Sequence, residues 1–210
     1  MDRKVINNQK LLENLKTVNW EIAVRVFGND HATLIGLLVT WWISGCPETR
    51  WVLEGAPSYE ENSGKCDAIL CENSSTVGIV EVEGSKPNNK IDNIRHYFEA
   101  RKPEFGSLEF AILLLYPYEL RGKGQDRKPR FEGDELAIMN SILKVTRTYP
   151  EKAIIVVKLH KVFEQNLNGI RTCNNYYKSK VTNIDGILYE DGKEVAKLTL
   201  FGGNDDGCGS

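Results

Sequence analysis

Apolar and polar residues follow two different periods along this chain. Residues 8–27 and 31–43 place apolar side chains at helical spacing, and the second stretch is apolar on most of its surface, as in a buried helix. Helical spacing returns at 87–101, where Pro87 suits a first turn, and at 133–148. The pattern therefore predicts four helices, with the second one buried.

Short apolar runs between these helices predict strands. The runs cover residues 50–53, 65–71, 77–83, 109–116 and 152–159. A hairpin is expected at 187–200, because Asp191-Gly192 is a favoured turn pair. A continuously apolar run such as 109–116 is typical of a strand covered on both faces. From 31 to 117 the expected order is helix, strand, strand, strand, helix, strand, so we predict an α/β protein with a central mixed sheet flanked by helices.

The length of the chain, 210 residues, suits one substantial domain. We expect a single domain over 1–210, with a core at 31–117, a C-terminal elaboration of helices and strands at 118–201, and a disordered tail at 202–210. The hydrophobic content of 41% and the charged content of 27% are ordinary for a soluble globular protein.

Charge and composition exclude several classes of protein. The net charge of −2 gives no global signal for nucleic acid, so any such contact must come from local basic segments. No apolar stretch reaches the roughly 18 residues that span a membrane, and the N-terminus is polar. We therefore expect a cytoplasmic protein without a membrane partner. The five cysteines lack a repeating spacing, which indicates neither a disulfide framework nor a structural zinc site.

Three carboxylates lie on two neighbouring predicted strands. Asp67 lies on the first strand, Glu81 and Glu83 lie on the second, and a polar turn at 73–76 joins them. Because side chains alternate along a strand, the two glutamates project from the same face. A hairpin brings Asp67 opposite them, to within one register step.

Three converging negative charges are unfavourable unless a cation or a shared proton relieves them. Oxygen ligands of this kind suit magnesium or manganese. Two glutamates on a strand usually mark its solvent face. Here, however, Val77 and Ile79 share the glutamates' face while Val80 and Val82 lie on the other, so both faces are expected to be partly buried. The pattern therefore favours a functional acidic cluster.

With this order of elements, the motif resembles that of the PD-(D/E)xK nuclease superfamily, the fold of many restriction endonucleases. Gly64-Lys65-Cys66-Asp67 supplies the first acid and Glu81-Val82-Glu83 occupies the tripeptide, in a Glu-x-Glu variant where Glu83 stands in place of the usual lysine. The resemblance covers 31–117 in topology, and the motif lies within 64–90. It implies a restriction-endonuclease-like αβββαβ core.

The resemblance also implies a magnesium-dependent or manganese-dependent deoxyribonuclease, an endonuclease that hydrolyses DNA. The implied metal ligands are two carboxylates and one carbonyl, from Asp67, Glu81 and Val82. Glu83 would orient or deprotonate the attacking water, or bind a second metal. Lys86 or Lys90 would reach back with the missing positive charge, although both also suit a solvated helix start. A glutamate from the preceding helices joins some such sites, and Glu21 and Glu54 are candidates.

Basic residues gather just after the predicted strand that ends at Tyr116. They are Arg121, Lys123, Arg127, Lys128 and Arg130. A glycine-rich basic loop can follow a phosphate backbone, but it is equally well explained as an exposed loop. A second stretch, 174–180, mixes amides, aromatics and cations that suit contacts with bases. The three histidines have no consistent partner and receive no role.

Other functions stay open at this point. A catalytically silent nucleic-acid-binding or regulatory module would explain the missing tripeptide lysine, and a protein-interaction domain would use the acidic cluster for docking. DNA is the expected partner, with RNA left open, and an enzyme that cuts both strands would be a homodimer.

Overall fold

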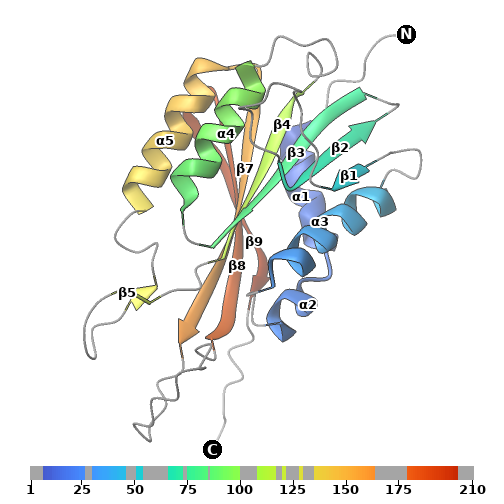
Figure 1. Cartoon of the computed structure of the whole chain (residues 1–210), viewed down its shortest axis with the longest axis vertical. Coiled ribbons are helices and arrows are strands. Elements are labelled where there is room, and N and C mark those ends of the chain that lie inside the picture. Colours follow the sequence, from blue (N-terminus) through green and yellow to red (C-terminus); the bar gives the residue numbers. More distant parts are fainter. Residues whose placement is uncertain are drawn as a thin grey trace, which may run out of the picture.

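A seven-stranded mixed sheet forms the centre of the computed structural model (Figure 1). The structure describes residues 7–26, 30–45, 51–53, 66–72, 75–84, 86–99, 108–116, 120–121, 128–129, 135–163 and 179–202. The strands of the sheet, in spatial order, are β1 (Trp51–Leu53), β2 (Ala68–Glu72), β3 (Ser75–Glu83), β4 (Phe110–Leu115), β7 (Ala153–Phe163), β8 (Ser179–Glu190) and β9 (Lys193–Gly202). β3, β4 and β7 are parallel to one another, and the remaining neighbours are antiparallel.

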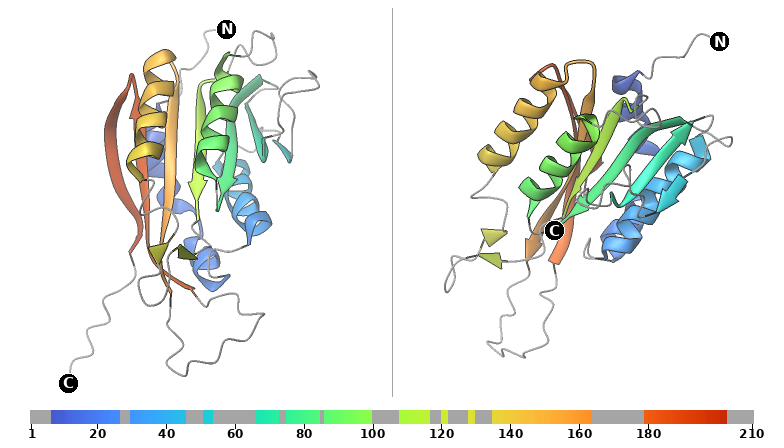
Figure 2. Two further views of the ribbon diagram at one scale, coloured as in Figure 1. Left: turned by 60° about the vertical axis from the view of Figure 1, so that its left-hand side comes forward. Right: turned by 45° about the horizontal axis from the view of Figure 1, so that its top comes forward.

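Helices cover both faces of the sheet (Figure 2). One face carries α1 (Asn8–Asn14), the short 3-10 helix η1 (Leu15–Thr17), α2 (Trp20–Arg25) and α3 (His31–Gly45), and the other carries α4 (Pro87–Glu99) and α5 (Glu135–Thr148). The alternation of β4 divides its apolar side chains between the two cores, as expected for a covered parallel strand. Phe110, Ile112 and Leu114 pack towards α3, and Ala111 and Leu113 pack towards α4 and α5.

The predicted α/β class and mixed sheet are confirmed. The order α3, β1, β2, β3, α4, β4 is the predicted order of helices and strands over 31–117. The predicted C-terminal additions, α5 and β7 to β9, extend the same sheet from β4. Of the tail expected at 202–210, Gly202 closes β9 and the rest lies outside the described residues.

The prediction of one helix over 8–27 is wrong, because this segment is divided into α1, η1 and α2. The backbone of Val18 is extended, with φ −63° and ψ 137°. The Leu15 carbonyl, which a continuing helix would offer to the amide of Asn19, instead accepts hydrogen bonds from the Val18 amide at 3.2 Å and from Nε1 of Trp20 at 2.9 Å. The indole therefore takes an acceptor that would otherwise continue the helix.

The face predicted for Val77 is also wrong. Leu70 pairs with Gly78 while Cys71 pairs with Thr76, so Val77 is the extra residue of a β-bulge. The bulge turns Val77 into the core beneath α3, together with Val80 and Val82. Ile79, as predicted, lies on the glutamates' face.

The predicted turn at Asp191-Gly192 is confirmed. Both residues have positive φ, 46° and 67°, which is the backbone of a type I′ turn between β8 and β9. The hairpin strands are longer than predicted and reach Ser179 and Gly202. Among the described helices, none is long and apolar enough to cross a membrane.

Candidate active site at the carboxyl end of β3

Asp67 lies beside the end of β3, in the predicted register. Ala68 pairs with Val80, and the Asp67 amide donates a 3.1 Å hydrogen bond to the Val80 carbonyl. Asp67 is therefore opposite Glu81, and residues directly opposite on antiparallel strands project from the same face. The prediction that these two carboxylates meet is confirmed.

Lys90, one turn into α4, lies between the two carboxylates. Its Nζ is 2.5 Å from Oε2 of Glu81 and 3.2 Å from Oδ2 of Asp67. The three side chains are largely shielded from solvent, with exposed fractions of 17% for Lys90, 14% for Asp67 and 0% for Glu81. At these exposures the ion pairs are screened much less than surface pairs.

Of the two lysines considered from the sequence, Lys90 reaches the carboxylates. The Lys86 side chain is exposed and forms no ion pair with another described residue. α4 begins at Pro87, so Lys90, Ile94 and Tyr97 share the helix face that packs on the sheet. That spacing is a sequence signal for Lys90 over Lys86.

Glu81 is fully buried at its carboxylate, which is unusual for an acid. Burial raises the pKa of Glu81 to about 7, against the opposing effect of the Lys90 charge. Its Oε1 has no hydrogen-bond partner among the described residues. An oxygen of this kind carries a desolvation cost that a bound cation would relieve.

Asp67 is held in its charged form. Burial favours the neutral acid, but hydrogen bonds from His31 and from the Val82 amide, together with the Lys90 charge, hold the pKa of Asp67 below its usual value. The Val82 amide is 2.7 Å from Oδ2. Burial opposes the charge of Lys90 as well, yet Glu81 and Asp67 raise its pKa above the ordinary value.

Two carboxylates and one carbonyl are available to a metal. The amide of Val82 points towards Asp67, and the carbonyl of the same residue lies on the same side of the strand. The sequence also suggested that Glu83 would converge with the other acids. Among the described residues, however, no three histidine, cysteine, aspartate or glutamate side chains are grouped so that they could hold a metal ion. Glu83 is partly buried at the end of β3, outside such a group.

His31 is a residue of this site that sequence reasoning missed. It is the first residue of α3, and its Nε2 lies 3.4 Å from Oδ1 of Asp67. Its Nδ1 lies 3.1 Å from the hydroxyl of Tyr116, which follows β4. Nothing near His31 in the sequence indicates this role. Only the capping residue Asp30, which receives hydrogen bonds from Thr33, fixes where the helix begins.

The other predicted site residues are only partly described. Arg121 and Lys128 pair in a two-stranded sheet of β5 (Leu120–Arg121) and β6 (Lys128–Pro129). Figure 1 places β5 near the carboxyl end of β7, the same end of the sheet as the carboxylates. The remaining basic residues of that group lie outside the described residues. They are Lys123, Arg127 and Arg130.

Of the remaining candidates of the predicted site, some are likewise described and others are not. Glu21 is exposed and pairs with Arg25, and Glu54 lies outside the described residues. Of the aromatic and amide stretch at 174–180, only positions 179 and 180, at the start of β8, are described.

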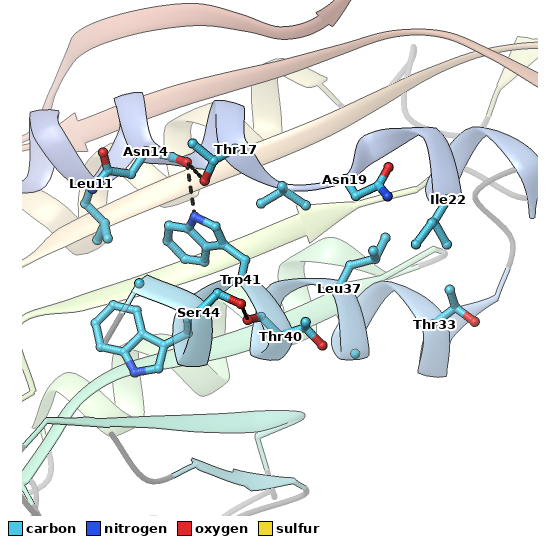
Figure 3. Close-up of a pocket in the computed structure, with 14 residues that line it drawn as sticks. Leu11, Asn14, Thr17, Asn19, Ile22, Thr33, Leu37, Thr40, Trp41 and Ser44 are labelled. Atoms are coloured by element: carbon cyan, nitrogen blue, oxygen red, sulfur yellow. Dashed lines mark hydrogen bonds between the residues drawn. The ribbon is translucent and has the colours of Figure 1, made fainter. Parts of the chain in front are cut away.

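A separate groove of about 850 Å³ runs between α3 and the segment from α1 to α2 (Figure 3). Leu37 and Trp41 from α3 face Leu11 and Ile22 across it, and the polar residues at its rim are uncharged. The indole of Trp41 donates to the Asn14 carbonyl, which ties the two walls together. The lack of charge among its described lining residues makes this groove unsuited to a phosphate backbone.

Comparison of the chain with protein-family models, with curated proteins and with solved structures gave no match.

Proposed function

We propose that this protein is a divalent-metal-dependent nuclease that hydrolyses DNA, with a restriction-endonuclease-like fold and a Glu-x-Glu form of the PD-(D/E)xK motif. The observation that carries the proposal is the meeting of Lys90 with both Asp67 and Glu81. The motif requires two acids and one lysine at the end of neighbouring strands, and α4 supplies the lysine that the tripeptide lacks.

The residues fit a hard divalent cation such as magnesium or manganese. Glu81 has a buried oxygen without a described hydrogen-bond partner, Asp67 is held ionised, and the Val82 carbonyl is on the same side of β3 as the amide that Asp67 binds. These three groups would hold the ion. When bound, such an ion stabilises charge on the phosphate and lowers the pKa of a bound water.

The chain's own residues would then divide the remaining work. The Lys90 ammonium is positioned to contact a phosphate oxygen, because it already lies against both carboxylates from the helix side. Glu83 would orient the water from the end of the strand. Basic residues after β4, including Arg121 and Lys128, would contact the phosphate backbone on the same end of the sheet.

A second candidate function is favoured by the same ion pairs. Lys90 already neutralises much of the negative charge of Asp67 and Glu81, so the cluster does not need a metal for stability. A catalytically silent module that binds nucleic acid would keep this arrangement. Such a module binds in a salt-sensitive way but is indifferent to magnesium.

The test is cleavage of supercoiled DNA, single-stranded DNA and RNA with magnesium, manganese or EDTA. The variants are Asp67→Asn, Glu81→Gln, Glu83→Gln and Lys90→Met. Asp92→Asn on the exposed side of α4 is the matched control, because Asp92 pairs only with Arg95 among the described residues. Each variant is checked for folding by circular dichroism.

Metal-dependent cutting that disappears in the Asp67 and Glu81 variants, but persists in the Asp92 control, would support the nuclease. The Glu83 variant then reports whether that glutamate contributes. Cutting that survives in folded Asp67→Asn protein would refute this active site. Binding of DNA without cutting, unaffected by magnesium, would favour the silent module.

A further inference from the structure

We propose that His31 and Tyr116 form a positioning pair that fixes the orientation of the Asp67 carboxylate, and that Tyr116 does so by holding the His31 ring in place through a hydrogen bond to Nδ1. This inference rests on the proposed function, since it assigns two further residues to the same centre. Neither residue belongs to the acidic motif, and neither lies near Asp67 in sequence.

The partners of the His31 ring determine where its proton lies when the ring is uncharged. The carboxylate of Asp67 only accepts hydrogen bonds, so Nε2 must carry the hydrogen in order to donate across the 3.4 Å separation. Nδ1 is then an acceptor, and the Tyr116 hydroxyl, 3.1 Å away, must donate to it. The chain of donors thus runs from Tyr116 through His31 to Asp67.

Tyr116 is itself well fixed. Its amide donates to the Glu83 carbonyl at 3.1 Å, which ties the end of β4 to the end of β3. Its ring is buried, meets the His31 ring edge-on at a centroid distance of 6.0 Å, and has the Lys161 ammonium 5.4 Å from its centroid. A ring held on these sides presents its hydroxyl to His31 in one direction.

The result is a carboxylate held at both oxygens. Oδ2 of Asp67 accepts a hydrogen bond from the Val82 amide and lies by Lys90, while Oδ1 lies 3.4 Å from Nε2 of His31. A carboxylate that must present an oxygen to a metal or a phosphate gains from being fixed in this way. Loss of such supporting hydrogen bonds typically lowers activity or metal affinity by about 10- to 100-fold.

The first readout does not depend on cleavage. Nitrogen NMR of the imidazole ring, in metal-free protein with the ring uncharged, should show the Nε2–H tautomer in the wild type. Tyr116→Phe should leave the proton on Nε2, because Asp67 still accepts there, but should shift the resonance of the acceptor Nδ1, which loses its hydroxyl donor. Tyr149→Phe is the control, because Tyr149 packs against Phe98 on the opposite core.

The second readout uses the chemistry of glutamine, whose amide can donate to Asp67 without a choice of tautomer. His31→Ala should lower kcat for DNA cleavage about tenfold, and His31→Gln should restore much of that loss. Tyr116→Phe should lower kcat about tenfold in the wild type, with KM for DNA little changed. In the His31→Gln background the same tyrosine substitution should have no further effect.

An Nδ1–H tautomer in the wild type, or a Tyr116→Phe spectrum identical to that of the Tyr149 control, would overturn the proposal. Loss of the Nε2 proton on addition of magnesium would overturn it as well, because His31 would then be a metal ligand. If the wild type shows the expected tautomers but cuts no substrate, the nuclease proposal fails while the positioning of Asp67 by His31 and Tyr116 stands.

Discussion

The Lys90 ammonium on α4 lies 2.5 Å from Oε2 of Glu81 on β3, and that carboxylate has no exposed surface. For a buried acid with one close cation, removing one partner and removing both have different effects on stability. Removing one partner leaves a charge without compensation, whereas replacing both by apolar groups restores a dry core. The stability of the protein should therefore depend strongly on whether one or both residues are changed.

We expect Lys90→Met to lower the free energy of unfolding by about 3 kcal/mol at a pH above the pKa of Glu81. The double variant Lys90→Met/Glu81→Met should recover most of this loss, because no buried charge remains. Urea denaturation without metal measures both. Arg95→Met is the control, since its pairs with Asp92 and Glu99 are exposed and should contribute less than about 1 kcal/mol. A double variant no more stable than the single one would refute this account.

Glu81 should also make the stability of the metal-free protein depend on pH. Burial raises its pKa from 4.5 to about 7, so between these values the folded state binds a proton that the unfolded state has lost. The stabilisation from this proton is complete below about pH 4.5 and disappears as the pH rises through 7, a loss of about 3 kcal/mol. Glu81→Gln lacks this titration. The measurement is the free energy of unfolding of both proteins across this pH range. It should fall with rising pH more steeply in the wild type than in Glu81→Gln. An equal pH dependence in the two proteins would contradict the prediction.

Local patterns were sufficient to predict the sheet and the meeting of two acids. The alternation along β3 and the polar turn before it placed Asp67 opposite Glu81–Glu83, to within one register step, and the structure places it opposite Glu81. The pattern could not reveal the bulge at Val77, because an extra residue in a strand cannot be recognised from the order of apolar and polar residues. The break between α1 and α2 was hidden for a similar reason, since it depends on a hydrogen bond from the Trp20 side chain.

The rest of the site depends on tertiary structure. His31 approaches Asp67 only because α3 begins at the end of the sheet where β3 and β4 finish. A lone histidine at a helix start has no pattern that separates this role from an ordinary surface position. Lys90 is different, since its helical spacing to Ile94 and Tyr97 marks it as facing the sheet.

The close packing of Gly78 against Phe110 gives a test of the sheet itself. A Cβ at position 78 would lie 2.3 Å from the Phe110 ring, in the parallel register that joins β3 to β4. Gly78→Ala should therefore destabilise the protein by about 1–3 kcal/mol. In a Phe110→Leu background the same substitution should cost less stability. Thermal unfolding provides the measurement.

Gly36→Ala is the matched control for this substitution. Position 36 lies inside α3 with nothing within 4 Å of the added Cβ, so alanine should stabilise the helix by roughly 0.5–1 kcal/mol. Equal effects of the two substitutions would contradict the packing of β3 on β4 seen here.

Lys90 should compete with the metal, because its ammonium lies on the same carboxylates that would bind the ion. Two unit charges about 4 Å apart at an effective dielectric near 20 interact by about 4 kcal/mol. Lys90→Met should therefore bind manganese about tenfold more tightly or better, even though it loses cleavage. Calorimetry above the pKa of Glu81 measures the affinity, and Lys86→Met, exposed at the start of α4, should leave it unchanged. Weaker binding by the Lys90 variant would show that the lysine supports the metal site instead of occupying it, and heat absent from both proteins would point to the silent module.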